Sequence, residues 1–460
     1  MICGRDDCTQ LLIDSGSNLE DRDISGDTAL ILAVKRGNIA CARSLVDAKA
    51  DIDALGRKHH RTALMWAVVN GCEESVRMLV RAGVDIDAKD MGGRAALMWA
   101  VKKGSVFAEL LVDAKANINA RDNNGATALM LALSERNAAC VKLLIDAKAD
   151  IDAKDKDGDT ALLRAVVNND ITFVEQLVDA KADIEASQNY GINALMRAVM
   201  HDKAAATKVL IEASADVEAA DNHGTTVLMR ATVGRSAVCV QLLLDAKVDI
   251  ERKNPLGCPP LMSAAWNANP ACIQMLLDAK ADVNVVSDDG WTALMYAADT
   301  DEGEAACLEL LVNAGAEIEA KNNYGWTALT VAALNSNSPR YLQMLLKAEA
   351  DMTVRDNNGR TVLMKAVEYG NTTCAKVLLD AKADIEVKDN EGNSALIWAS
   401  FNGNFECAQL LLDAKASIDV ENNDGETALM WAAIAGRIEA LEMLIHAGGA
   451  RRDPSSGTNP

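Results

Sequence analysis

Apolar strings separated by polar residues recur along this chain at a regular interval. A string of the form T-A-L-M is followed, after a few polar residues, by a second apolar stretch such as CARSLVDAKA. This alternation predicts two short helices in each unit. The first position of the string falls at Thr28, Thr62, Ala95, Thr127, Thr160, Asn193, Thr226, Pro259, Thr292, Thr327, Thr361, Ser394 and Thr427.

The spacing of these strings defines a tandem repeat. From Thr28 to Thr427 there are 12 intervals over 399 residues, or about 33 residues per repeat. Asp- and Asn-rich residues with a Gly two positions before the Thr predict a turn, and the Thr hydroxyl can cap the helix that follows. One such unit cannot bury its apolar face alone, so thirteen units are expected to stack.

The repeated motif also carries a family resemblance. The D-x-x-G-x-T-x-L string, the two-helix spacing and the L-L-x-x-x-A-D ending resemble the ankyrin-repeat family over residues 1–450. The resemblance implies an all-α repeat solenoid of antiparallel helix pairs, with projecting β-turn or hairpin loops and a concave surface of turn tips and first helices. It also implies protein binding, because most members bind proteins and share no catalytic residues.

The repeat register divides the chain into three expected parts. A partial repeat or cap at residues 1–20 precedes an ankyrin-repeat domain at residues 21–450, and residues 451–460 are expected to be a disordered tail. Repeat eight holds four of the seven prolines. This predicts either a seam between two sub-stacks of repeats near residues 255–270 or only a rigid turn. These prolines are Pro255, Pro259, Pro260 and Pro270.

Two positions depart from the family pattern. The T-P-L-H string becomes T-A-L-M, so an apolar Met replaces a hydrogen-bonding ring. Where the family has Gly at the end of the second helix, this chain has Lys. If that position keeps a left-handed backbone, each Lys costs up to roughly 1 kcal/mol relative to Gly. These residues, expected to form a solvated charge ladder, are Lys49, Lys115, Lys148, Lys181, Lys247, Lys280, Lys382 and Lys415.

Charge and hydropathy narrow the choice of partner and location. The net charge of −21 disfavours nucleic acid and favours a basic protein or peptide, although it can equally serve only to maintain solubility. No signal peptide and no apolar run of about 20 residues is found, so we expect a cytoplasmic location, with the nucleus as an alternative. We expect a monomer.

The cysteines are expected to belong to the core. Six of them occupy one slot, 13 residues after the Thr position, and no C-x-x-C pair occurs, so neither a metal site nor a cofactor is expected. His59 and His60 lie in the basic turn RKHHR, which is either a recognition tip or an exposed loop. The six cysteines are Cys41, Cys140, Cys239, Cys272, Cys374 and Cys407.

The residue four positions after the Thr is the main candidate for partner contacts. This position is expected near the exposed side of the first helix. In successive repeats it holds three arginines that form a ladder, two stacked Trp pairs near the ends, and one residue of an aromatic cluster in repeats nine and ten. The alternatives are ion pairs with turn residues and half-buried packing. The candidates are Arg164, Arg197 and Arg230; Trp66 with Trp99; Trp398 with Trp431; and Trp291, Tyr296, Tyr324 and Trp326.

No catalytic motif accompanies these candidates. Strings of the types G-x-x-x-x-G-K-[ST], G-x-S-x-G and H-E-x-x-H are absent from the sequence. The sequence therefore favours a non-catalytic scaffold or adaptor that binds a protein or peptide on the concave surface. The alternative is a regulatory ankyrin array that is a fragment of a larger enzyme or channel.

Overall fold

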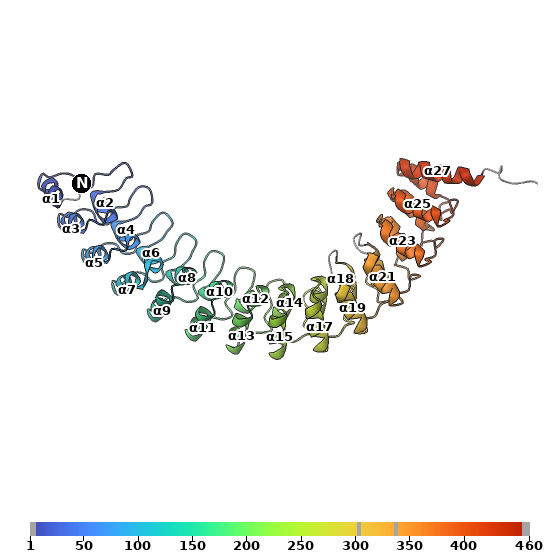
Figure 1. The fold of residues 1–460 in the computed structure, drawn as a ribbon, viewed down its shortest axis with the longest axis horizontal. Helices are drawn as coiled ribbons and strands as arrows, with labels where there is room; N and C mark the ends of the chain where they lie inside the picture. Colours follow the sequence, from blue (N-terminus) through green and yellow to red (C-terminus); the bar gives the residue numbers. More distant parts are fainter. Residues whose placement is uncertain (1–5, 301–304, 335–338, 453–460) are drawn as a thin grey trace, which may run out of the picture. The chain divides into compact units, whose positions relative to one another are not determined.

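The computed structural model describes residues 6–300, 305–334 and 339–452, and this part of the chain contains 27 α-helices (Figure 1). Two isolated antiparallel bridges, Arg22 with Thr28 and Arg355 with Thr361, are its only β-structure. The prediction of an all-α solenoid is therefore confirmed.

The chain divides into two compact units, residues 1–222 and 223–460. The first helices of the repeats in the first unit are α2 (Ala29–Lys35), α4 (Ala63–Asn70), α6 (Ala96–Lys103), α8 (Ala128–Ser134), α10 (Ala161–Val167) and α12 (Ala194–Met200). Its second helices are α1 (Asp6–Asp14), α3 (Ile39–Asp47), α5 (Glu73–Arg81), α7 (Ser105–Asp113), α9 (Ala138–Asp146), α11 (Ile171–Asp179) and α13 (Ala204–Glu212).

The second unit repeats this arrangement. Its first helices are α14 (Val227–Val233), α16 (Pro260–Trp266), α18 (Ala293–Ala298), α20 (Ala328–Leu334), α22 (Val362–Glu368), α24 (Ala395–Asn402) and α26 (Ala428–Ile434). Its second helices are α15 (Ala237–Asp245), α17 (Pro270–Asp278), α19 (Ala305–Asn313), α21 (Pro339–Lys347), α23 (Thr372–Asp380), α25 (Phe405–Asp413) and α27 (Ile438–Arg452). Within each unit the first helices line one side and the second helices the other (Figure 1).

The Thr position caps the first helix, as predicted. The Thr62 hydroxyl accepts the Met65 amide at 3.3 Å, and Asn193 and Ser394 accept the equivalent amides in their repeats. Ala95 and Pro259 make no side-chain cap. The replacement Met residues are fully buried in most repeats, for example Met65 at 1% exposure, but Met430 in the last repeat is 49% exposed.

The turns of neighbouring repeats are joined by a ladder of hydrogen bonds. In the second unit the Asn357 amide donates to the Tyr324 carbonyl, and its side chain donates to the Asn323 carbonyl at 2.8 Å. Gly325, with φ +79°, lies against this Asn, and a Cβ there would fall 2.6 Å from Asn357 Oδ1. The glycine is therefore required both by its left-handed backbone and by the close approach of the next turn.

A second ladder links the segments that follow the second helices. The Asp85 amide donates to Asp53 Oδ1 at 2.7 Å, and the Asp183 amide donates to Asp152 Oδ1 at 2.8 Å. Some of the acidic side chains therefore hydrogen-bond one repeat to the next. The eight lysines keep the left-handed backbone on which their expected cost depends, with φ values between 59° for Lys247 and 74° for Lys415.

The ends and the proline-rich repeat have regular packing where they are described. Helix α1 packs on α3, and the Thr9 hydroxyl donates to Cys41 Sγ at 3.0 Å. Pro260 and Pro270 are the first residues of α16 and α17, where the missing amide costs nothing. The seam near residues 255–270 stays a prediction. Helix α27 ends at Arg452, so residues 453–460 of the expected tail lie outside the described residues.

Candidate functional site

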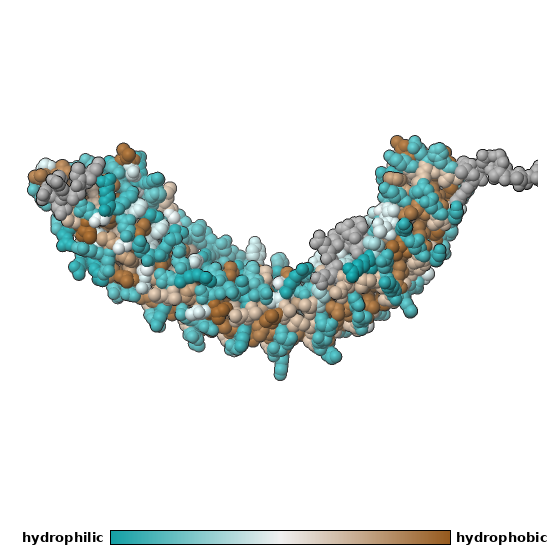
Figure 2. Space-filling view, viewed as in Figure 1, coloured by the Kyte–Doolittle hydropathy of each residue, from teal (hydrophilic) through white to brown (hydrophobic). Residues whose placement is uncertain are grey.

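The candidate residues lie on what we call the turn-side face, formed by the turn residues before each Thr position and the first helices. In each unit the visible surface is mostly hydrophilic, with hydrophobic residues interspersed (Figure 2). The residue four positions after the Thr is half-buried in most repeats. Several of these residues are tied to the base of their own turn: Trp99 Nε1 donates to Asp90 Oδ2 at 3.1 Å, and Trp398 Nε1 donates to Asp389 Oδ2 at 2.9 Å.

The structure brings together the aromatic residues predicted in repeat nine. The Trp291 and Tyr296 rings stack at 5.1 Å, and Trp266 from α16 meets Tyr296 edge-on at 5.5 Å. The Tyr296 hydroxyl lies 3.5 Å from Cys258 Sγ, and burial raises the pKa of Tyr296 above its usual value. Trp266 is 56% exposed, so this cluster has a buried base and an open aromatic edge.

Repeat ten contributes a second stacked pair. The Tyr324 and Trp326 rings are 5.2 Å apart, and Tyr324 at the turn tip is 59% exposed. Lys365 Nζ lies 5.2 Å from the Trp326 ring and 5.1 Å from the Tyr369 ring. Residues 301–304, after α18, and residues 335–338, after α20, lie outside the described residues.

Two of the three residues of the arginine ladder, Arg164 and Arg197, already have ion-pair partners. Arg164 donates to Asp155 Oδ2 in its own turn, and Arg197 donates to Asp159 at 2.8 Å. Burial raises the pKa of Asp155, but the bonds from Arg164 and two turn amides outweigh it, so the pKa is lowered overall. The third member, Arg230, lies on α14 in the second unit and is half-buried. A role in partner binding stays a prediction.

The predicted Trp pairs do not stack directly, and this is a correction to the sequence interpretation. The Arg61 guanidinium lies between the two rings of the first pair, with Cζ 4.9 Å from the Trp66 centroid and 3.9 Å from the Trp99 centroid. Phe401 lies between Trp398 and Trp431, at 6.2 Å and 4.9 Å. In both pairs a third side chain thus lies between the two Trp rings.

The sequence interpretation missed several residues of this face. Trp266 and Phe401 stand seven positions after the Thr position and Tyr369 stands eight, about one helical turn beyond the residue four positions after the Thr. Arg360 stands directly before the Thr, and Arg61, at the equivalent position, was noted only as the last residue of the basic turn RKHHR. Following these positions in register would have marked the residues as candidates, although not the contacts that they make.

Clefts surround the first Trp pair on the turn-side face. A cleft of about 370 Å³ is lined by Arg61, Arg94, Trp99 and turn residues, and one of about 140 Å³ by Lys35, Lys58 and Trp66; both share His59 and Arg61.

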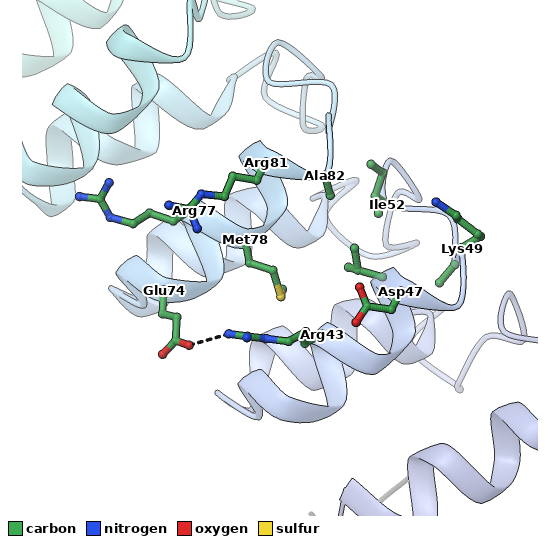
Figure 3. Close-up of a pocket in the computed structure, with 11 residues that line it drawn as sticks. Arg43, Asp47, Lys49, Ile52, Glu74, Arg77, Met78, Arg81 and Ala82 are labelled. Atoms are coloured by element: carbon green, nitrogen blue, oxygen red, sulfur yellow. Dashed lines mark hydrogen bonds and ion pairs between the residues drawn. The ribbon is translucent and has the colours of Figure 1, made fainter.

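A third cleft, of about 660 Å³, lies on the opposite side of the same repeats, between α3 and α5 (Figure 3). Figure 3 shows Arg43 reaching from α3 to Glu74 on α5, an ion pair of 2.9 Å, with Met78 between the helices. Both members of this pair are more than half exposed, so it adds little rigidity.

The slot cysteines are buried and unbridged, as predicted. Burial raises the pKa of Cys140, Cys272 and Cys374 to about 11, which keeps these thiols protonated near neutral pH. Among the residues with described positions, no three His, Cys, Asp or Glu side chains gather as a metal site would need. None of the described helices has the length and apolar character needed to cross a bilayer.

Comparison with known proteins identifies the same repeat that the sequence and the structure show. A family model described as ankyrin repeats (three copies) matches residues 1–90, 97–188, 162–254, 261–356, 302–389, 337–423 and 363–456. The B-cell lymphoma 3 protein homolog of Mus musculus is 36% identical over 104 residues, which are 22% of this chain and 23% of that protein. The palmitoyltransferase AKR1 of Lachancea kluyveri is 32% identical over 97 residues, 20% of this chain and 13% of that enzyme.

Among solved structures, the crystal structure of the ankyrin repeat domain of Bcl-3, described as a unique member of the IkappaB protein family, is 30% identical. It covers 48% of this chain and 99% of its own, with a TM-score of 0.45. Ankyrin repeats are generally protein–protein interaction modules and the fold is typically non-catalytic, although some enzymes contain such segments. The family model matches nearly the whole chain, and the chain therefore belongs to the ankyrin-repeat family.

Proposed function

We propose that this chain is a non-catalytic scaffold or adaptor that binds a partner protein or peptide on the turn-side face of repeats eight to ten. The observation that carries the proposal is the pair of aromatic clusters there, Trp266–Trp291–Tyr296 and Tyr324–Trp326.

The exposure of these rings supports the proposal. Trp266 and Tyr324 leave more than half of their surface in water although each contacts a neighbouring ring, Trp266 edge-on and Tyr324 with its ring tilted. A preordered aromatic ring loses little conformational entropy when a partner covers it, and Trp and Tyr are the commonest interface anchors. Reduced, buried thiols are consistent with the cytoplasmic or nuclear location that we propose.

The test is an affinity capture from native lysate followed by mass spectrometry. We expect proteins captured by the unchanged chain to be reduced at least about tenfold by the double substitution Tyr324→Ala and Trp326→Ala, because central aromatic anchors contribute about 2 kcal/mol or more. Circular dichroism of both forms checks that helicity is unchanged.

The chain supplies a matched control in Tyr190. It occupies the same turn-tip position in repeat six, is 66% exposed, and is followed at the Trp326 position by Ile192. Tyr190→Ala should leave capture unchanged. Equal capture by all three forms would place the partner elsewhere and refute the proposed site.

A regulatory array belonging to a larger protein is the second candidate. It is favoured by the similarity to a segment of palmitoyltransferase AKR1, which is an enzyme by its name. In that case the partner would be another domain of the same polypeptide, and a longer transcript from the source would reveal it.

A further inference from the structure

We propose that repeats one to three form a second binding site, on the first unit, for an acidic peptide segment of a partner protein. This site is separate from the aromatic clusters of repeats eight to ten. Its centre is the Arg61 stack, which we define as Arg61, Trp66, Trp99 and Asp90.

The first argument is that the Arg61 guanidinium lacks a close carboxylate. Its faces are covered by Trp66 and Trp99, and its ion pair with Asp90 Oδ2 is long, at 3.9 Å. Arg61 Nε is buried and makes no hydrogen bond. Burial lowers the pKa of Arg61, although Asp90 acts against this. A guanidinium in this state gains from a carboxylate that arrives along its open edge.

The second argument is an internal replica that has that carboxylate. We define the Arg360 stack as Arg360, Trp398, Asp389 and Glu368. Arg360 Cζ lies 3.9 Å from the Trp398 centroid and Arg360 Nε lies 3.9 Å from Asp389 Oδ2, the same distances as in the Arg61 stack.

The replica differs at its open edge. Arg360 donates to both Glu368 oxygens, at 2.9 Å and 3.1 Å, and Lys365 Nζ lies 2.8 Å from the same carboxylate. Glu368 stands seven positions after Thr361, and Val69 is the residue seven positions after Thr62. The Arg61 stack lacks this glutamate and has Trp66 in the place of Lys365, so its open edge is left for a partner's carboxylate.

The third argument is the arrangement of charge around the stack. Between residues 35 and 103 the chain has 13 Lys and Arg and eight Asp and Glu, a net charge of +5, whereas the whole chain carries −21. Two clefts flank Arg61 and contain Lys35, Lys58 and Arg94. The carboxylates beneath them are almost fully buried: Asp27 is 4% exposed and Asp122 is 8% exposed.

Those buried carboxylates also have partners within the protein: Lys35 Nζ donates to Asp27 Oδ2 at 3.0 Å, and Arg94 Nε lies 3.7 Å from Asp122 Oδ2. Asp90 Oδ1 accepts the Gly92 and Arg94 amides at 2.9 Å, and Asp122 Oδ1 accepts two amides of its own turn. Cations therefore form the outer layer and anions the inner one. A peptide carrying Glu side chains complements this surface, while the acidic remainder of the chain repels a long polyanion such as nucleic acid.

The test is fluorescence anisotropy on the full chain with a short fluorescein-labelled peptide of alternating Glu and Ala. The matched peptide has Gln in place of Glu. We expect the Glu peptide to bind at least about tenfold more tightly than the Gln peptide, with the preference weakening as salt is raised. Equal binding of the two peptides overturns the proposal.

Two substitutions locate the site. Val69→Glu supplies the missing carboxylate from within and should weaken binding of the Glu peptide at least about tenfold. Val167→Glu is the control: it adds the same charge at the same position of repeat five, where Asp159 replaces the arginine before the Thr. Equal effects of the two changes overturn the proposal.

The replica permits a gain-of-function test. Glu368→Val opens the Arg360 stack and should create a second binding site for the Glu peptide, provided that circular dichroism shows the fold to be kept. Arg61→Gln, which removes the guanidinium, should abolish the original site. A single-stranded oligonucleotide that binds more tightly than the Glu peptide and is lost with Arg61→Gln would instead assign the surface to nucleic acid and overturn the peptide proposal. Because every variant except Glu368→Val lies in the first unit, failure here leaves the site at repeats eight to ten untouched.

Discussion

A Lys→Gly substitution should have opposite effects on stability at two positions only six residues apart, Lys148 after helix α9 and Lys142 within it. Lys148 follows helix α9 with φ 66° and is exposed, so its side chain has no packing to lose. A non-glycine residue in this conformation costs roughly 1–2 kcal/mol, while glycine adds about 0.5–1 kcal/mol of unfolded-state entropy. Loss of a cation near the helix C-terminus removes roughly 0.3 kcal/mol more.

Lys148→Gly should therefore raise the free energy of unfolding by about 0.5 kcal/mol. The control is Lys142→Gly, an exposed position inside α9, which should lower it by about 1 kcal/mol because glycine is a poor helix former. Urea unfolding followed by circular dichroism measures both. Because repeat arrays unfold in steps, the two variants should be compared at the transition that involves repeat four. Destabilisation by Lys148→Gly equal to that by Lys142→Gly would refute the reasoning.

Three further predictions concern the turns, the thiols and the Trp pairs. Gly359→Ala should lower the free energy of unfolding by about 1–3 kcal/mol, and by more than Gly436→Ala does. Both glycines have positive φ, but only Gly359 has the Asn390 side chain against it; urea unfolding of the two variants measures the difference. Native Cys140, Cys272 and Cys374, with pKa values raised to about 11, should react slowly with a thiol reagent at pH 8 and quickly after unfolding. Since the thiols ionise at a lower pH in the unfolded chain than in the folded one, the free energy of unfolding should fall as pH rises from about 9 to about 11. A free energy of unfolding that does not change over this range would contradict the burial argument. Trp99→Phe keeps an aromatic ring but removes the bond to Asp90, and should cost about 1–2 kcal/mol by thermal unfolding; no change would show that the bond is not needed.

The repeat unit could be predicted from the sequence almost completely. The Thr position predicted the helix caps, and Cys140 and its counterparts predicted one buried slot. These features depend on contacts within a repeat or between equivalent positions, so the register of the sequence carries them.

Contacts between different positions of neighbouring repeats could not be predicted in the same way. Arg61 enters the space between two Trp rings, and Phe401 enters the space between two others. Reading one position at a time along the chain suggested direct Trp stacking. The pairing of a residue before the Thr with one four positions after the next Thr becomes visible only when the repeats are stacked.

Hydrogen exchange on the captured complex tests the central claim most directly. A partner bound on the turn-side face of repeats eight to ten should slow exchange in the turn segments that hold Trp291, Tyr324 and Trp326, and in helix α16. The second helices α17 and α21, on the other side of the unit, should exchange as in the free chain. Protection of those second helices without protection of the turns would contradict the account.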